Sequence, residues 1–121
     1  MFMLNKKIVA QAIIEKVQDE HDDVDIRTSL LEGFERPDKI VIKGNQGKGF
    51  TPDVLLKTDD STEFYEIELN QEFNLEKWKL FSLYLNKEKG SLNIVTPEDN
   101  LPQLRSFLND NQINARILFF A

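Results

Sequence analysis

Cysteine is absent from this sequence, and histidine occurs once, at His21. The lack of cysteine excludes disulfides, thiolate metal sites and a cysteine nucleophile. One histidine cannot build a multi-histidine zinc site. Any bound metal must therefore have oxygen ligands, which favours Mg²⁺, Mn²⁺ or Ca²⁺. His21 follows the acidic run at 19–20 and precedes that at 22–23, so we interpret it as a surface residue in a solvated connection.

Long hydrophobic runs are also absent, and none approaches the roughly 20 residues needed to cross a bilayer. The first seven residues lack the charged region and apolar core of a signal peptide. We therefore expect a cytoplasmic protein that does not enter a membrane. The net charge of −6 argues against a general electrostatic grip on nucleic acid. It is compatible with a nucleic-acid enzyme, because a carboxylate metal site adds negative charge that bound cations offset.

The composition is that of an ordinary globular protein, with 121 residues, of which 40% are hydrophobic and 30% charged. This length is typical of one domain and is sufficient for a hydrophobic core. No linker, repeat or low-complexity segment interrupts the chain, so we expect a single domain over residues 1–121.

Hydrophobic periodicity predicts alternating helices and strands. Residues 5–20 have the spacing of a helix, with Asn5 as its N-cap, and the helices that follow are expected over 74–87 and from 97 onward. Expected strands cover 25–31, 39–43, 54–57, 63–69, 92–96 and 115–120. The glycine-rich segment 44–49 lacks the Lys-Ser/Thr ending of a phosphate-binding loop, so we interpret it as a hairpin loop. The fold class is α/β, a mixed sheet flanked by helices on both faces.

Carboxylates are the only concentrated chemical signal. Glu66 and Glu68 share one face of the strand at 63–69, because side chains alternate between faces. Burying such a pair without a cation is costly, so this strand end is either open to water or holds a metal. A solvent-facing edge strand would show the same alternation.

A third carboxylate, Asp53, begins the preceding strand directly after Pro52. A turn near residues 58–62 joins the two strands. Counting back from that turn places Asp53 opposite Leu69 or Glu68, with an uncertainty of a residue or two. The sequence therefore predicts that Asp53 lies near the two glutamates.

The segments Gly49–Leu56 and Phe64–Leu69, together with the order of elements, resemble the PD-(D/E)XK nuclease superfamily. The resemblance covers about residues 5–96. It implies a restriction-endonuclease-like α-β-β-β-α-β core, to which this chain adds a C-terminal helix and strand. It also implies that Asp53 and Glu66 bind Mg²⁺ or Mn²⁺, which would position a water and stabilise charge at a scissile phosphate. A second Pro-Asp pair, Pro37-Asp38, lies before a different strand, and Asp53 is preferred.

The chain departs from the motif at its third position, where Glu68 stands in place of the usual lysine. Some members of the superfamily have glutamate there, and others supply a lysine from the next helix. Lys77 and Lys79 are the candidates for that role, with Lys79 preferred as a catalytic residue beside Asp53, Glu66 and Glu68. The family often adds a metal-binding glutamate from the first helix, for which Glu20 is preferred over Glu15.

Two functions follow from the resemblance. One is a metal-dependent nuclease that hydrolyses phosphodiesters of DNA or RNA. The other is a catalytically inactive nuclease-fold domain that binds nucleic acid or protein, which the missing lysine and the negative charge favour. A homodimer is expected for the nuclease, because two active sites would then face two strands. Surface lysines near the strand hairpins and on the helix at 74–87 are the basic groups available to a phosphate backbone: Lys39, Lys43, Lys48, Lys57, Lys77, Lys79, Lys87 and Lys89.

Overall fold

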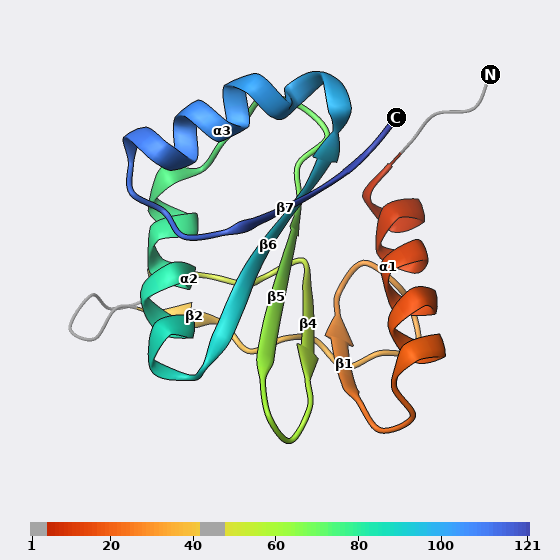
Figure 1. The fold of residues 1–121 in the computed structure, drawn as a ribbon. Coiled ribbons are helices and arrows are strands. Elements are labelled where there is room, and N and C mark those ends of the chain that lie inside the picture. The colour runs from red at the N-terminus through yellow and green to blue at the C-terminus, as the bar shows by residue number, and fades with distance from the viewer. Residues whose placement is uncertain (1–4, 42–47) are drawn as a thin grey trace.

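The computed structural model describes residues 5–41 and 48–121, so Lys43 and the expected loop residues 44–47 lie outside the described residues. Its elements follow one another in an α/β order (Figure 1). They are α1 (Lys6–Glu20), β1 (Asp25–Thr28), β2 (Ile40–Val41), β3 (Gly49–Phe50), β4 (Val54–Lys57), β5 (Thr62–Ile67), α2 (Leu75–Lys87), β6 (Gly90–Pro97), the 3₁₀ turn η1 (Glu98–Asn100), α3 (Leu101–Asp110) and β7 (Arg116–Phe120).

The main sheet is mixed and five-stranded, in the order β1-β4-β5-β6-β7. The β1-β4 and β4-β5 pairs are antiparallel, whereas β5-β6 and β6-β7 are parallel. The parallel neighbours are connected through α2 and α3, as the alternation of strand and helix in the second half of the sequence predicts. Of the expected strand at 39–43, the structure describes residues 39–41, in which β2 pairs with β3 in a two-stranded sheet separate from the main one.

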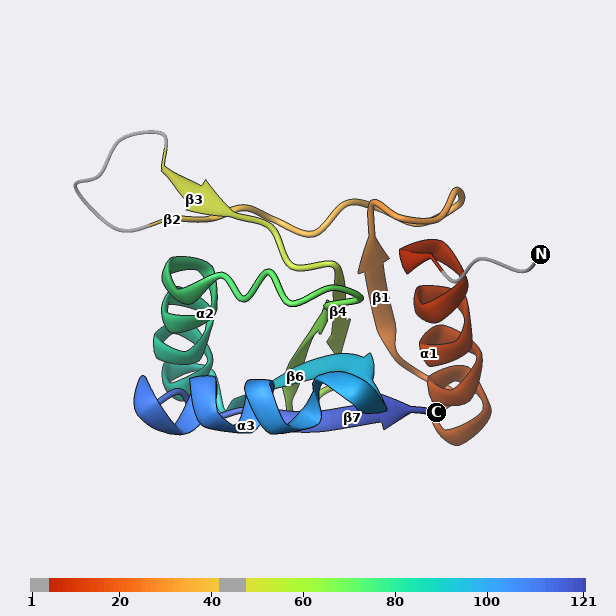
Figure 2. The ribbon, with the colours of Figure 1, turned by 90° about the horizontal axis from the view of Figure 1, so that it is seen from above.

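Helices cover both faces of the main sheet, which confirms the expected architecture. On one face, α1 packs Val9 and Ile14 against Val54 and Ile67. On the other face, α2 and α3 bury a larger cluster that includes Phe64 and residues of β6. Figure 2 shows α1 and α2 on opposite sides of the strands.

Asparagine side chains cap the starts of α1 and α2. The Asn5 side chain accepts a hydrogen bond from the backbone N–H of Ile8 at 3.0 Å, which confirms Asn5 as the N-cap of α1. Asn74 caps α2 in the same way by accepting from the N–H of Lys77, also at 3.0 Å. These caps fix where each helix begins, and hence where Lys6 and Lys77 lie in the first turns.

The β4-β5 hairpin has a different register from the one expected. Lys57 pairs directly with Thr62 and Val54 with Tyr65, so Asp53 stands opposite Glu66 rather than Glu68 or Leu69. The turn spans residues 58–61 and is closed by a bond from the Thr58 N–H to the Ser61 carbonyl, so the pair of Lys57 with Thr62 sets the register. The shift brings the two acidic residues of the motif directly across from one another.

Candidate functional site

Asp53 lies just before β4 and is held by three elements. Its Oδ2 atom accepts a hydrogen bond from the backbone N–H of Ile67 in β5, at 2.8 Å. Its backbone carbonyl accepts one from the hydroxyl of the fully buried Thr28 in β1, at 2.7 Å. The ammonium group of Lys6 in α1 lies 3.2 Å from Oδ2. The Asp53 side chain is only 12% exposed, so its position and rotamer are closely constrained.

Glu66 is the most deeply buried carboxylate of the site, with 4% of the residue exposed. Its Oε2 atom accepts a hydrogen bond from the backbone N–H of Asp53 at 2.9 Å. Its Oε1 atom accepts from the indole Nε1–H of Trp78 at 3.3 Å and forms an ion pair with Nζ of Lys77 at 2.7 Å. Every oxygen of this buried group therefore has a partner, as burial of a charge requires.

Burial raises the pKa of Glu66 above its ordinary value of 4.5, and the negative charge of Asp53 raises this pKa further. The ammonium group of Lys77 and the hydrogen bond from the Asp53 N–H act in the opposite direction. A carboxylate that is desolvated and close to a like charge has a strong electrostatic preference for a nearby cation. Perturbation of this kind is typical of functional sites, although structural ion pairs produce it too.

Asp53 and Glu66 form a reciprocal pair. The N–H of Asp53 donates to the Glu66 carboxylate, and the N–H of Ile67, which follows Glu66, donates to the Asp53 carboxylate. The two side chains thereby continue the hydrogen bonding of the β4-β5 hairpin beyond its last strand pair, Val54 with Tyr65. Backbone geometry, rather than flexible side-chain contacts, holds the two carboxylates together.

Glu68 does not join this pair, contrary to the expectation of three gathered carboxylates. β5 ends at Ile67, and the Glu68 carboxylate turns into the following loop, where it accepts from the N–H groups of Asn70 at 3.0 Å and Glu72 at 3.4 Å. Burial raises the pKa of Glu68, while those two N–H donors lower it. Within residues 5–41 and 48–121 no cluster of three or more His, Asp or Glu side chains is arranged to hold a metal.

Lys79 is also placed away from the site, so the preference for Lys79 over Lys77 was wrong. Residues two positions apart on an α-helix, such as Lys77 and Lys79, are separated by about 200° around the helix axis. Lys77 lies one turn before the buried Phe81, and its Nζ lies 5.8 Å from the centre of that ring as well as against Glu66. Lys79 faces the opposite way, into an apolar groove beside Leu83 and Tyr84. The four-residue spacing from Lys77 to Phe81 is the signal that identifies the inward lysine.

The first helix contributes Lys6, not Glu20. Helix α1 is about 21 Å long between these residues, and its N-terminal end is the one beside Asp53. Glu20 lies at the other end, where it lines a pocket with Thr58 and Ser61 of the hairpin turn. The expected metal-binding role of Glu20 therefore does not fit this structure. A short connection joins α1 to β1, and Asp25, the first residue of β1, pairs with Lys57 beside that turn. The C-terminal end of α1 must therefore lie near the turn, which places the N-terminal end beside Asp53.

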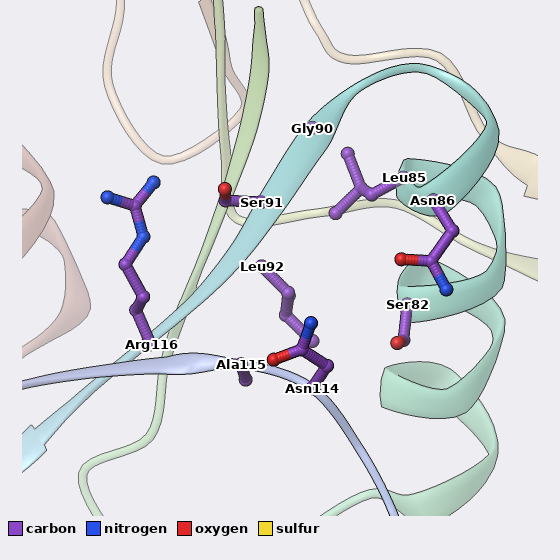
Figure 3. Close-up of a pocket in the computed structure, with 9 residues that line it drawn as sticks. All are labelled: Ser82, Leu85, Asn86, Gly90, Ser91, Leu92, Asn114, Ala115 and Arg116. Atoms are coloured by element: carbon purple, nitrogen blue, oxygen red, sulfur yellow. The ribbon is translucent and has the colours of Figure 1, made fainter.

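A small cavity of about 60 Å³ lies at the same far end, near the start of β6 (Figure 3). The polar residues Ser91 and Arg116 line it, together with Ser82, Asn86 and Asn114. Figure 3 shows Arg116 pointing away from these three side chains, and its guanidinium forms an ion pair with Glu63. Gly90 at this cavity pairs with Thr62, whereas Ile94 pairs with Glu66, so the cavity is separate from the carboxylate pair.

Comparison of the chain with models of protein families, with curated proteins and with solved structures finds no match. No helix in the described ranges is long and apolar enough to cross a membrane. Any functional proposal therefore depends on the chemistry of the site itself, which is a buried carboxylate pair flanked by Lys6 and Lys77.

Proposed function

We propose that this chain is a metal-dependent nuclease, in which Asp53 and Glu66 hold a Mg²⁺ or Mn²⁺ ion and act on a phosphodiester. The observation that supports it best is the reciprocal hydrogen bonding that brings Asp53 and Glu66 together. These are the two acidic residues that the resemblance to PD-(D/E)XK nucleases selects. The register that places them opposite one another differs from the one expected from the sequence. This register supports the motif, because it brings its two acidic residues together.

The donor set fits a hard divalent cation. Both side chains offer carboxylate oxygens, the ligands that Mg²⁺ and Mn²⁺ prefer. The Lys6 side chain that pairs with Asp53 is 44% exposed, so its ammonium group can move into solvent and leave room for a cation. Glu66 remains buried and desolvated, which strengthens its attraction for positive charge.

Each neighbouring residue has a distinct role in this proposal. When bound, the metal supplies charge stabilisation at the scissile phosphate. Lys77 holds the Glu66 carboxylate in place and provides the cationic group that Glu68 cannot provide at the third motif position. Trp78 donates to the same Glu66 oxygen and, at 2% exposure, excludes water from behind it. Glu68 orders the loop that follows β5 through its two backbone hydrogen bonds.

Calorimetric titration of Mn²⁺ into the protein tests the proposal without any assumption about substrate. We expect binding in the wild type and its loss in both Asp53→Ala and Glu66→Ala. Asp59→Ala is the matched control, because Asp59 is an exposed carboxylate in the hairpin turn at the far end of β4. Cleavage of DNA and RNA substrates in Mg²⁺ or Mn²⁺, lost in the same two variants, then tests the activity. A folded wild type that binds no Mn²⁺ at millimolar concentration contradicts the metal site.

A second candidate function is a catalytically inactive nuclease-fold domain that binds nucleic acid or protein. The observation that favours it is the presence of two ion pairs, Lys6 with Asp53 and Lys77 with Glu66, which balance both carboxylates without a metal. This alternative predicts nucleic-acid or protein binding that is unaffected by EDTA. The expected homodimer belongs to the nuclease proposal, and light scattering during size-exclusion chromatography measures it directly.

A further inference from the structure

The Lys6–Asp53 ion pair occupies the oxygens that a metal would need. Lys6 Nζ lies 3.2 Å from Oδ2 and 3.4 Å from Oδ1 of Asp53, so one ammonium group spans both oxygens. An ammonium group and a divalent cation that use the same two oxygens cannot both have full contact with them. The described structure therefore has a resident competitor for the metal.

The two lysines of the site differ in how easily they can leave. The Lys77 side chain is 17% exposed and its partner Glu66 is buried, so separating this pair would leave a buried charge without compensation. The Lys6 side chain is 44% exposed and lies in the first turn of α1, where its ammonium group reaches solvent by rotation of its side chain alone. When this exposed ammonium group leaves, it returns to water, and the 12% exposed Asp53 side chain keeps the Ile67 N–H as a partner. Lys6 is thus the replaceable cation and Lys77 the fixed one.

Lys6 also has a second anionic neighbour. Its positive charge interacts favourably with Glu68 as well as with Asp53, with which it forms the ion pair. When the ammonium group leaves Asp53, the Lys6 side chain still holds it close to the site. A phosphate oxygen is the kind of anion that a lysine in this position binds, since lysine acts on phosphates as a mobile point charge.

We propose that Lys6 exchanges between Asp53 and a phosphate of the nucleic acid, so that metal binding at Asp53 and phosphate binding by Lys6 favour one another. This inference rests on the proposed function, and it adds a positioning residue that the sequence motif does not contain. Such coupling is reciprocal, so bound metal raises the affinity for phosphate by the same factor as bound phosphate raises the affinity for metal.

Mn²⁺ titration of the protein alone tests the competition. Lys6→Met removes the ammonium group and keeps the length of the side chain, and we expect it to bind Mn²⁺ about two- to fivefold more tightly than wild type. Lys7→Met is the matched control, with the same change in net charge one residue along the helix. Equal Mn²⁺ affinities for Lys6→Met and Lys7→Met would overturn the competition, because only a general charge effect would then remain. Circular dichroism establishes that both variants are folded.

Binding of a labelled DNA duplex, followed by fluorescence anisotropy over a series of salt concentrations, tests the exchange. In Ca²⁺, Lys6→Met should lower the slope of log affinity against log salt by about 1, the loss of one phosphate contact. In EDTA, where Lys6 stays on Asp53, the variant and the wild type should have the same slope. A slope difference that is the same in Ca²⁺ and EDTA, or absent in both, would overturn the exchange.

These outcomes are distinguishable from failure of the proposed function. Tighter Mn²⁺ binding by Lys6→Met, together with a Ca²⁺-dependent slope and no cleavage of any substrate, supports the exchange and contradicts the nuclease. Cleavage with no difference between Lys6→Met and Lys7→Met in either assay supports the nuclease and contradicts the exchange.

Discussion

Removal of the Lys77 ammonium group is the most informative perturbation of stability. Lys77→Met keeps most of the aliphatic side chain but leaves the Glu66 carboxylate, 4% exposed, without its cation. Breaking a buried ion pair from one side typically costs about 3–5 kcal/mol. Because the Trp78 N–H and the Asp53 N–H still donate to Glu66, we expect a smaller loss, about 2–3 kcal/mol of unfolding free energy at pH 7.

The loss should depend on pH in a defined direction. The pKa of Glu66 in the folded protein is raised above its ordinary value of 4.5, first by burial and then by Asp53, and Lys77 lowers it. A carboxyl group with a raised folded-state pKa disfavours the folded state increasingly as pH rises from its unfolded pKa through its folded pKa. Lys77→Met raises that folded pKa further. The difference between variant and wild type should therefore be small below about pH 4.5 and grow toward pH 7.

Urea denaturation followed by circular dichroism at several pH values measures this difference. Lys79→Met is the matched control, since it removes the same charge two residues away, in the apolar groove beside Leu83 and Tyr84, and should change stability by less than about 0.5 kcal/mol. The double variant Glu66→Gln with Lys77→Met should recover only part of the loss, because the Glu66 charge is removed but the amide has a single acceptor oxygen for the two N–H donors of Asp53 and Trp78. Equal effects of Lys77→Met and Lys79→Met at pH 7, or a loss that does not shrink on acidification, would refute the argument that Lys77 compensates Glu66.

Two further predictions concern the residues that support the sheet. Gly90→Ala should destabilise the protein by about 2 kcal/mol or more in urea denaturation, because the new Cβ would overlap the backbone carbonyl oxygen of Thr62 as well as Leu85; unchanged stability would contradict the close strand contact. Thr28→Val should cost about 1–3 kcal/mol, since it leaves the Asp53 carbonyl without its 2.7 Å donor and the Leu30 N–H without its 3.1 Å acceptor. If Thr28 positions Asp53, the same variant also weakens Mn²⁺ binding in calorimetry, whereas unaltered metal affinity would limit Thr28 to a structural role.

The sequence was a good guide to the elements and a poorer guide to their relative placement. Periodicity located α1 and α2 to within a residue, and capping chemistry identified Asn5 as the start of α1. The faces of β5 were also predicted correctly, because alternation alone puts Phe64 with Glu66 and Tyr65 with Ile67. These features depend only on local backbone geometry.

The misplaced site residues all required information about three-dimensional arrangement. The register of Asp53 against Glu66 depends on the closure of one turn, and an error of two residues there passes to the whole strand pair. Choosing Glu20 assumed which end of α1 reaches the site, although the register of β1 against β4 decides it. Lys6 belongs to no motif, and its contact with Asp53 spans 47 residues of sequence.

The reciprocal bonds between Asp53 and the Glu66–Ile67 segment also give the protein two internal reporters. The amide protons of Asp53 and Ile67 each point at a carboxylate oxygen of the site. Their chemical shifts in a ¹⁵N-edited nuclear magnetic resonance spectrum will consequently respond to whatever charge those oxygens carry or bind. An observer following these two resonances can watch protonation, loss of the Lys6 contact or arrival of a metal, with no chemical probe attached to the protein.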